Sequence, residues 1–225
     1  LKFNASITPE NVADLPAMIA FAKAQECPIQ VATYMFPPLR RDSSLVGQND
    51  RLSPEDAALA RATADLLQNE PEWFVTQAMR FREFIPLEKK PWEMGLPREE
   101  AMRCRAGLCS LWVDWQGNFS NCGMYPSVSV PDPLPSFRET WEQVVSDTAQ
   151  VRFTAACFGC PNRLLCHPCI AMIHNECGSH EGRPEYMCRM NEALSRCYDQ
   201  LAREHYPDVS PIFGIAQEPS DTCEI

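Results

Sequence analysis

The distribution of cysteine constrains this chain more than any other feature of its sequence. Nine of the 12 cysteines in 225 residues lie between positions 104 and 188, and the stretch CFGCPNRLLCHPC at 157–169 contains four of them. Cysteine thiolates bind zinc tetrahedrally, or bind iron–sulfur clusters through four ligands. Because a chain of this length does not need disulfide bonds to supplement a small core, the spacing predicts a metal or cluster site.

The spacing alone does not name the metal. The four cysteines follow the pattern CxxCx5CxxC at positions 157, 160, 166 and 169. Zinc ribbons usually separate two CxxC pairs by about 15–20 residues, and bacterial ferredoxins use a tighter CxxCxxC run. Disulfide bonds and buried reduced thiols are the alternatives. Cys27, Cys197 and Cys223 stand apart, and we interpret them as thiols without a metal role.

Composition excludes several kinds of partner. A net charge of −10 is unfavourable for binding a nucleic-acid backbone. No apolar run approaches the roughly 18 residues of a membrane span, and no signal peptide precedes the first strand. We therefore expect a cytoplasmic protein. The chain begins LKFNASIT, without an initiator Met, which we interpret as the C-terminal part of a longer protein.

The first 90 residues have the pattern of an α/β unit. KFNASI predicts a strand, and Thr8, Pro9 and Glu10 predict the start of a helix. Pro16 requires either a kink in this helix or a separate first turn, with Asp14 then capping the main helix. PIQVATYMF predicts a second strand buried on both faces, as in parallel sheets. Helices are expected over 53–69 and 71–84.

The remaining residues have a different character. LWVDWQGNFSNC at 111–122 predicts a β-hairpin, and YPSVSVPDPLP predicts an irregular link. Ser136 and Glu139 predict a helix over 137–149, followed by a short helix near 168–176 and a longer one over 184–204. We divide the chain into a first domain at 1–90, a second at 91–205 and a tail at 206–225.

The order of the cysteines resembles a known family. Cys104, Gly117 and Cys122 form Cx12Gx4C, CxxCx5CxxC follows, and Cys188 ends PEYMC. This series resembles the SPASM domain, the auxiliary-cluster module at the C-terminus of radical S-adenosylmethionine enzymes. The chain departs from the family at Cys166 and Cys169, which are one residue closer together than usual.

The resemblance implies a fold class. FNASITPEN and VATYMFPPLRR resemble barrel segments that lie near S-adenosylmethionine in these enzymes. The first 90 residues would be an α/β piece, the C-terminal βα units of a partial TIM-type barrel. The second domain would be a small irregular α+β SPASM domain, with a β-hairpin and helices around two cluster sites.

The resemblance also implies two [4Fe–4S] clusters. Cys104, Cys122 and Cys169 would hold the first and are called site I below, with Cys109 as the candidate for a fourth ligand. The second, site II, would use Cys157, Cys160, Cys166 and Cys188. Cys177 we interpret as a thiol outside both sites.

The implied activity is the radical modification of a peptide or protein, in an anaerobic bacterium, with flavodoxin or ferredoxin as electron donor. The auxiliary clusters would transfer electrons or bind substrate. The catalytic cluster of this family needs a Cx3Cx2C loop, and residues 1–103 contain none. This chain alone is therefore expected to be inactive, and a third [4Fe–4S] cluster and S-adenosylmethionine would bind only to the full-length enzyme.

Other residues carry weaker expectations. Asn4 and Arg40 are candidates for contact with S-adenosylmethionine or substrate, and His167 is expected to be a loop residue. The aromatic side chains of the hairpin, Trp112, Trp115 and Phe119, are expected in the core. Gly123 stands where sulfatase-maturating members have a catalytic Asp, which argues against that chemistry. The alternative function is a non-enzymatic, zinc-binding interaction module, and the third possibility is a secreted disulfide protein.

Overall fold

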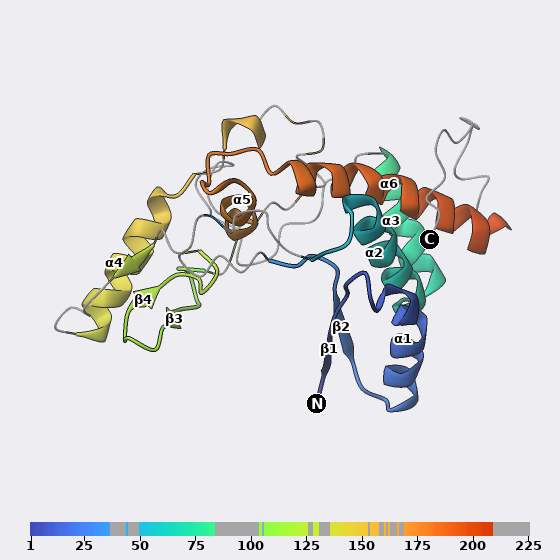
Figure 1. Cartoon of the computed structure of the whole chain (residues 1–225), viewed down its shortest axis with the longest axis horizontal. Coiled ribbons are helices and arrows are strands. Elements are labelled where there is room, and N and C mark those ends of the chain that lie inside the picture. Colours follow the sequence, from blue (N-terminus) through green and yellow to red (C-terminus); the bar gives the residue numbers. More distant parts are fainter. Residues whose placement is uncertain are drawn as a thin grey trace.

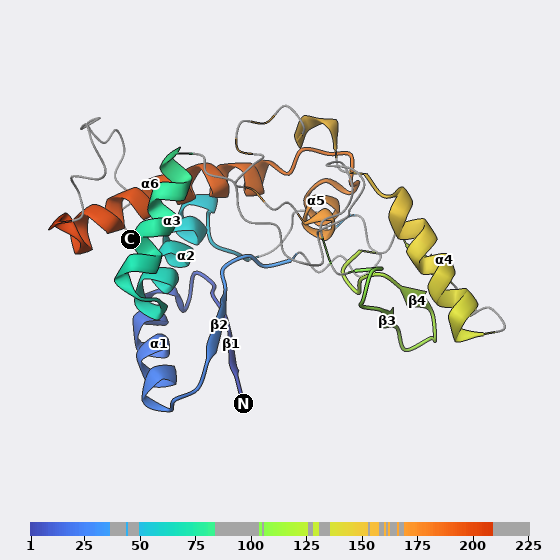
Figure 2. The same cartoon turned by 180° about the vertical axis from the view of Figure 1, so that it is seen from behind.

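The computed structural model describes residues 1–36, 44, 50–83, 104, 106–125, 128–130, 136–152, 154–157, 160, 162, 166 and 169–208. The chain is elongated, with two groups of helices and short strands at its two sides (Figures 1 and 2). The described strands form one two-stranded and one three-stranded sheet, with no closed barrel among them. The partial barrel therefore stays a prediction. None of the helices in the described part of the chain has the length and apolar character needed to cross a bilayer.

A parallel βαβ unit opens the chain, as predicted. Strand β1 (Phe3–Ser6) pairs in parallel with β2 (Ile29–Ala32), and helix α1 (Leu15–Ala24) connects them. A separate 3-10 turn, η1 (Val12–Asp14), precedes α1, so Pro16 falls in the first helical turn. A proline is tolerated there because its missing N–H would have no helical partner. The alternative of a separate first turn is therefore correct, and no kink is needed.

The second strand differs from its prediction. It ends at Ala32, and Gln30 is exposed, so the strand is not buried on both faces. The reason is that β1 and β2 pair only with each other among the described strands. Gln30 instead accepts a hydrogen bond from Lys2 at the surface, at 2.7 Å.

Three helices contribute most of the larger core, which also includes Leu15 and Ile19 of α1. Helix α2 (Pro54–Gln68) begins at Ser53, whose Oγ accepts the Asp56 N–H at 3.0 Å, and α3 (Pro71–Glu83) follows directly. Both predicted helices are thus confirmed. Five alanines of α2 are fully or almost fully buried, which lets the long helix α6 (Glu185–His205) pack closely against it. The buried side chains of α6 belong to this core, although our division at residue 90 placed α6 in the second domain.

A buried ionic cluster joins segments that are far apart in the sequence: Tyr34 and Arg51, which lie between β2 and α2, contact Glu176 and Tyr186. The Arg51 guanidinium donates to both carboxylate oxygens of Glu176, and the Tyr34 hydroxyl donates to the same carboxylate at 2.6 Å. Arg51 also stacks on the Tyr186 ring, 3.6 Å from its centroid. Burial raises the pKa of Tyr186 to about 12, so its hydroxyl stays protonated and donates to the Leu52 carbonyl at 3.0 Å.

The predicted hairpin is present, and a third strand extends it. Strands β3 (Trp112–Val113) and β4 (Phe119–Ser120) pair antiparallel, and Asp114 closes their turn by accepting from the Gln116 and Asn118 N–H groups at 2.8 and 2.9 Å. Strand β5 (Ser129–Val130) pairs with β4. We had predicted an irregular link there, which is wrong for these two residues.

Two further helices complete the second core. Helix α4 (Phe137–Gln150) begins at Ser136, whose Oγ accepts the Glu139 N–H at 3.2 Å, as the capping signature predicted. Helix α5 (Ile170–Cys177) ends at a left-handed glycine, Gly178. Apolar side chains of α4, α5 and β5 enclose Tyr125, which is 1% exposed. This smaller core lies beside the cysteine-rich segment.

Gly107 provides a test of this second core. Its φ is +68°, and a Cβ atom added there would lie 2.3 Å from the Thr148 hydroxyl of α4. We expect Gly107→Ala to lower the free energy of unfolding by about 1–3 kcal/mol, because overpacking and backbone strain act together. Gly117→Ala is the matched control, since Gly117 also has a positive φ (+87°) but nothing within 4 Å of the added atom. Urea unfolding measures both losses, and equal losses in the two variants would contradict the close packing of Gly107 against Thr148.

Candidate metal centres

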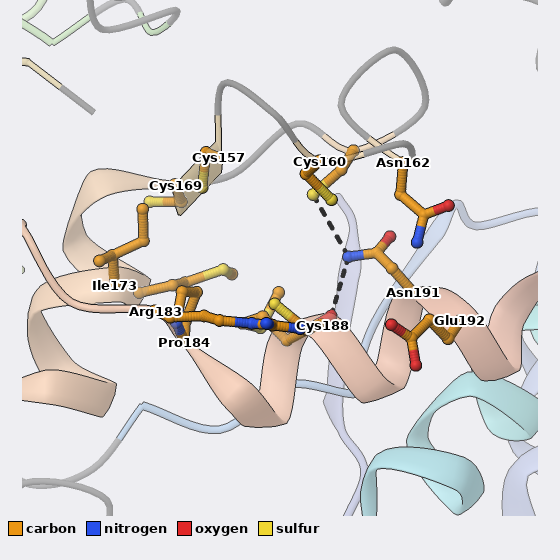
Figure 3. A pocket seen from close by; sticks show the side chains of 13 residues that line it. Cys157, Cys160, Asn162, Cys169, Ile173, Arg183, Pro184, Cys188, Asn191 and Glu192 are labelled. Atoms are coloured by element: carbon orange, nitrogen blue, oxygen red, sulfur yellow. Dashed lines mark hydrogen bonds between the residues drawn. The ribbon is translucent and has the colours of Figure 1, made fainter. Parts of the chain in front are cut away.

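The four cysteines of site II line one pocket. Cys157 ends the short turn η4 (Ala155–Cys157), Cys160 and Cys166 come from the segment after it, and Cys188 lies in the first turn of α6. Figure 3 shows Cys157 and Cys160 on the upper side of the pocket and Cys188 on the helix below. All four are half-buried. The structure thus places the predicted site II residues around one space.

Backbone hydrogen bonds hold these cysteines in position. The Cys166 N–H donates to the Asn162 carbonyl at 2.8 Å, and the Cys157 N–H donates to Thr154 at 3.0 Å. The Cys188 N–H donates to the Pro184 carbonyl at 3.0 Å, as expected in the first turn of α6. Local turns therefore fix the backbone at these three cysteines, from which the sulfurs extend.

The three predicted cysteines of site I also lie near one another. Burial raises the pKa of the Cys169 thiol, and the neighbouring Cys104 and Cys122 raise it further. The backbone N–H groups of Ala171 and Met172, at the start of α5, act in the opposite direction. This arrangement brings together residues from before the hairpin, after the hairpin and the start of α5.

Backbone N–H groups also point at the other two sulfurs of site I. The Ala106 N–H donates to Cys104 Sγ at 3.5 Å, and the Met124 N–H donates to Cys122 Sγ at 3.4 Å. Cys109, the candidate fourth ligand, is exposed in the turn before Ser110.

Cys169 belongs to the surroundings of both sites. It lines the site II pocket together with the four cysteines of site II, and it packs against the smaller core together with Cys122 of site I. The two predicted sites therefore lie side by side, with Cys169 between them. Sequence spacing could not show this, because the arrangement depends on how the turn before α5 approaches the hairpin.

The remaining described cysteines lie elsewhere or have other contacts. Cys27 donates to the Leu1 carbonyl at 3.4 Å, and Cys197 is fully buried in the larger core. Cys177 lies near Cys188. Burial raises the pKa of the Cys177 thiol, and the neighbouring Glu176 and Cys188 raise it further. Its side chain packs on Gly182, where an added Cβ would come within 2.3 Å of the Cys177 Cβ. Cys223 lies outside the described residues.

The described cysteines are all free thiols. No disulfide bond joins the 11 that the structure describes. In the same part of the chain, no group of three or more His, Cys, Asp or Glu side chains is compact enough to hold a single metal ion. The donor set itself fits an iron–sulfur group, since five thiols line the pocket and Met172, Ile173, Pro184 and Met187 add apolar surface to it.

Two of the three hairpin aromatics are not core residues as predicted, whereas Phe119 packs against the smaller core. Trp112 is 56% exposed and Trp115 is 90% exposed, whereas Phe119 is half-buried. The strands are only two residues long, so the turn carries its side chains beyond the core. The Trp112 ring lies against Gly123, where an added Cβ would come within 2.8 Å of the indole. A residue larger than glycine at 123 would therefore displace this tryptophan.

Of the two candidate contacts to S-adenosylmethionine, the structure describes Asn4. Asn4 is exposed on β1, opposite Gln30 in the parallel pair. Arg40 and His167 lie outside the described residues.

Two side chains that the sequence analysis did not select also line the site II pocket. The Asn191 amide donates to Cys166 Sγ at 3.4 Å, and Arg183 extends toward Cys188 (Figure 3). Asn191 is three residues after Cys188, so helical spacing could have placed both on one face of α6. Arg183 gave no comparable signal, because it precedes the helix.

Comparison with protein-family models, with curated proteins and with solved structures finds no match to this chain.

Proposed function

We propose that this chain is the C-terminal part of a radical S-adenosylmethionine enzyme with a SPASM domain, and that sites I and II each hold a [4Fe–4S] cluster. Cys104, Cys122 and Cys169 would hold one, and Cys157, Cys160, Cys166 and Cys188 the other. Clusters bound there would supply one-electron redox chemistry. The substrate of the whole enzyme would be a peptide or protein.

One observation supports the proposal most strongly. Four cysteines that the cysteine order assigned to one site line one pocket, although Cys188 is 22 residues from Cys166. A structural role for the thiols alone does not require this convergence. Binding a metal group across such distant segments closes a long loop and so contributes folding free energy.

The position of Cys169 between the two sites supports an electron-transfer role. Because Cys169 contacts the surroundings of both sites, groups held at sites I and II would lie close together. The half-buried thiols would also leave each group near the surface, where an electron donor such as flavodoxin or ferredoxin could approach. Substrate binding at site I is the other proposed role, since only three of its ligands are assigned.

The proposal is tested by reconstituting the full chain with iron and sulfide in the absence of oxygen. We expect about eight irons and about eight sulfides per chain, four for each cluster, together with brown colour from sulfur-to-iron charge transfer. Zinc added in parallel should not displace them. A colourless chain that binds one or two zinc ions and no iron would instead support the zinc-binding interaction module.

A further inference from the structure

The Asn191 side chain is fixed with one N–H aimed at a sulfur of site II. Its Nδ2 atom donates to the Met187 carbonyl at 3.0 Å and to Cys166 Sγ at 3.4 Å (Figure 3). A backbone carbonyl can only accept a hydrogen bond, so the nitrogen of the amide must face Met187. The second N–H of the same nitrogen is then available to Cys166. The amide orientation is therefore set by the helix.

Arg183 places a positive charge at another sulfur of the same pocket. Its side chain lines the pocket together with Cys188 and Cys160. Figure 3 shows its side chain extending along the pocket toward Cys188. Arg183 Nε is 3.6 Å from a Glu185 oxygen, but both of these side chains are more than half exposed. That ion pair is screened by water and holds the arginine only weakly.

These two contacts have a predictable consequence for a redox group. Reduction adds negative charge to an iron–sulfur group and its thiolate ligands. N–H donors and a nearby cation stabilise the more negative state, so they raise the reduction potential. The Glu192 carboxylate also lines the pocket and acts in the opposite direction.

We propose that Asn191 and Arg183 are positioning residues that set the reduction potential of the group at site II, Asn191 by donating an N–H to Cys166 Sγ and Arg183 by placing its positive charge beside Cys188. This inference rests on the proposed function. The two residues act at different sulfurs, so their effects on the potential should add.

The test is a redox titration of the anaerobically reconstituted full chain, followed by electron paramagnetic resonance. The signal of site II is identified as the one lost in Cys188→Ala. We expect Asn191→Leu and Arg183→Met each to lower its midpoint potential at unchanged iron content, and the double variant to lower it further. Arg183→Lys, which keeps the charge but not the guanidinium, should fall between wild type and Arg183→Met.

Gln200→Leu is the matched control. Gln200 also lies on α6, but its amide donates to Glu204 at 2.9 Å on the exposed surface. Its removal should leave the potential unchanged. The signal of site I should also keep its potential in every variant.

Several outcomes would overturn the inference. Unchanged potentials in both single variants, with full iron content, would overturn it and leave the proposed function intact. Loss of the site II signal in Arg183→Met would show that this exposed residue holds the group rather than tunes it, which also overturns the inference. If Asn191→Leu lost iron, the midpoint potential of Arg183→Met would decide: a lowered potential would support the inference, and an unchanged one would overturn it. A wild-type chain without iron would overturn the inference and the proposed function together.

Discussion

In Cys188→Ala, the iron bound per chain is expected to fall from about eight to about four, since one of two four-iron groups loses a ligand. Cys122→Ala should cause the same loss at site I, and the double variant should bind almost no iron. The physical reason is that the remaining sulfurs of each site come from segments that the missing ligand no longer ties together. Iron and sulfide analysis after anaerobic reconstitution measures this directly.

Cys177→Ala is the matched control for this experiment. Cys177 is a half-buried thiol close to Cys188, but it does not line the site II pocket. We expect it to bind the wild-type amount of iron. Equal losses in Cys177→Ala and Cys188→Ala would contradict the ligand assignment, and so would full iron content in Cys188→Ala.

Arg51→Met is expected to have the largest effect on stability. The Glu176 side chain is 7% exposed and the Arg51 side chain 12% exposed, so removing the guanidinium leaves a buried carboxylate without its cation. Among the described residues, the Tyr34 hydroxyl would then be its remaining hydrogen-bond donor. Breaking a buried ion pair in this way costs about 3–5 kcal/mol. Urea unfolding of the full chain measures the loss.

Two variants separate the buried charge from other causes. Adding Glu176→Gln to Arg51→Met should recover much of the stability, because a neutral amide still accepts from Tyr34 and no buried charge remains. Arg189→Met removes another bidentate pair, with Glu55, but Arg189 is 54% exposed. Its cost should be at most about 1 kcal/mol. Equal losses in Arg51→Met and Arg189→Met would contradict the role of burial.

Local signals in the sequence predicted much of the secondary structure. Ser53 and Ser136 cap helices where expected, and Asp114 closes the hairpin turn. These features depend on residues within four positions of one another, so local sequence patterns are sufficient to predict them. Strand β5 carried no such signal, because two residues between prolines become a strand only when β4 offers a partner.

Longer-range features were predicted less well. Helix α6 begins beside Cys188, but its later turns pack on α2 and α3, since its buried side chains match the alanine face of α2. Trp112 and Trp115 are hydrophobic, yet the hairpin leaves them exposed. The cysteine order, through the family resemblance, assigned Cys157, Cys160, Cys166 and Cys188 to one site, and these four line one pocket that Cys169, assigned to the other site, also lines. It did not predict Arg183 and Asn191, whose contacts arise only once α6 is placed against the pocket.

X-ray absorption at the iron edge, on the anaerobically reconstituted wild-type chain, tests the central claim most directly. Two sulfur-ligated clusters predict iron surrounded by sulfur in the first coordination sphere, with further iron atoms as the next neighbours. Iron bound only by nitrogen or oxygen, isolated iron without iron neighbours, or a folded chain that takes up no iron would contradict the claim.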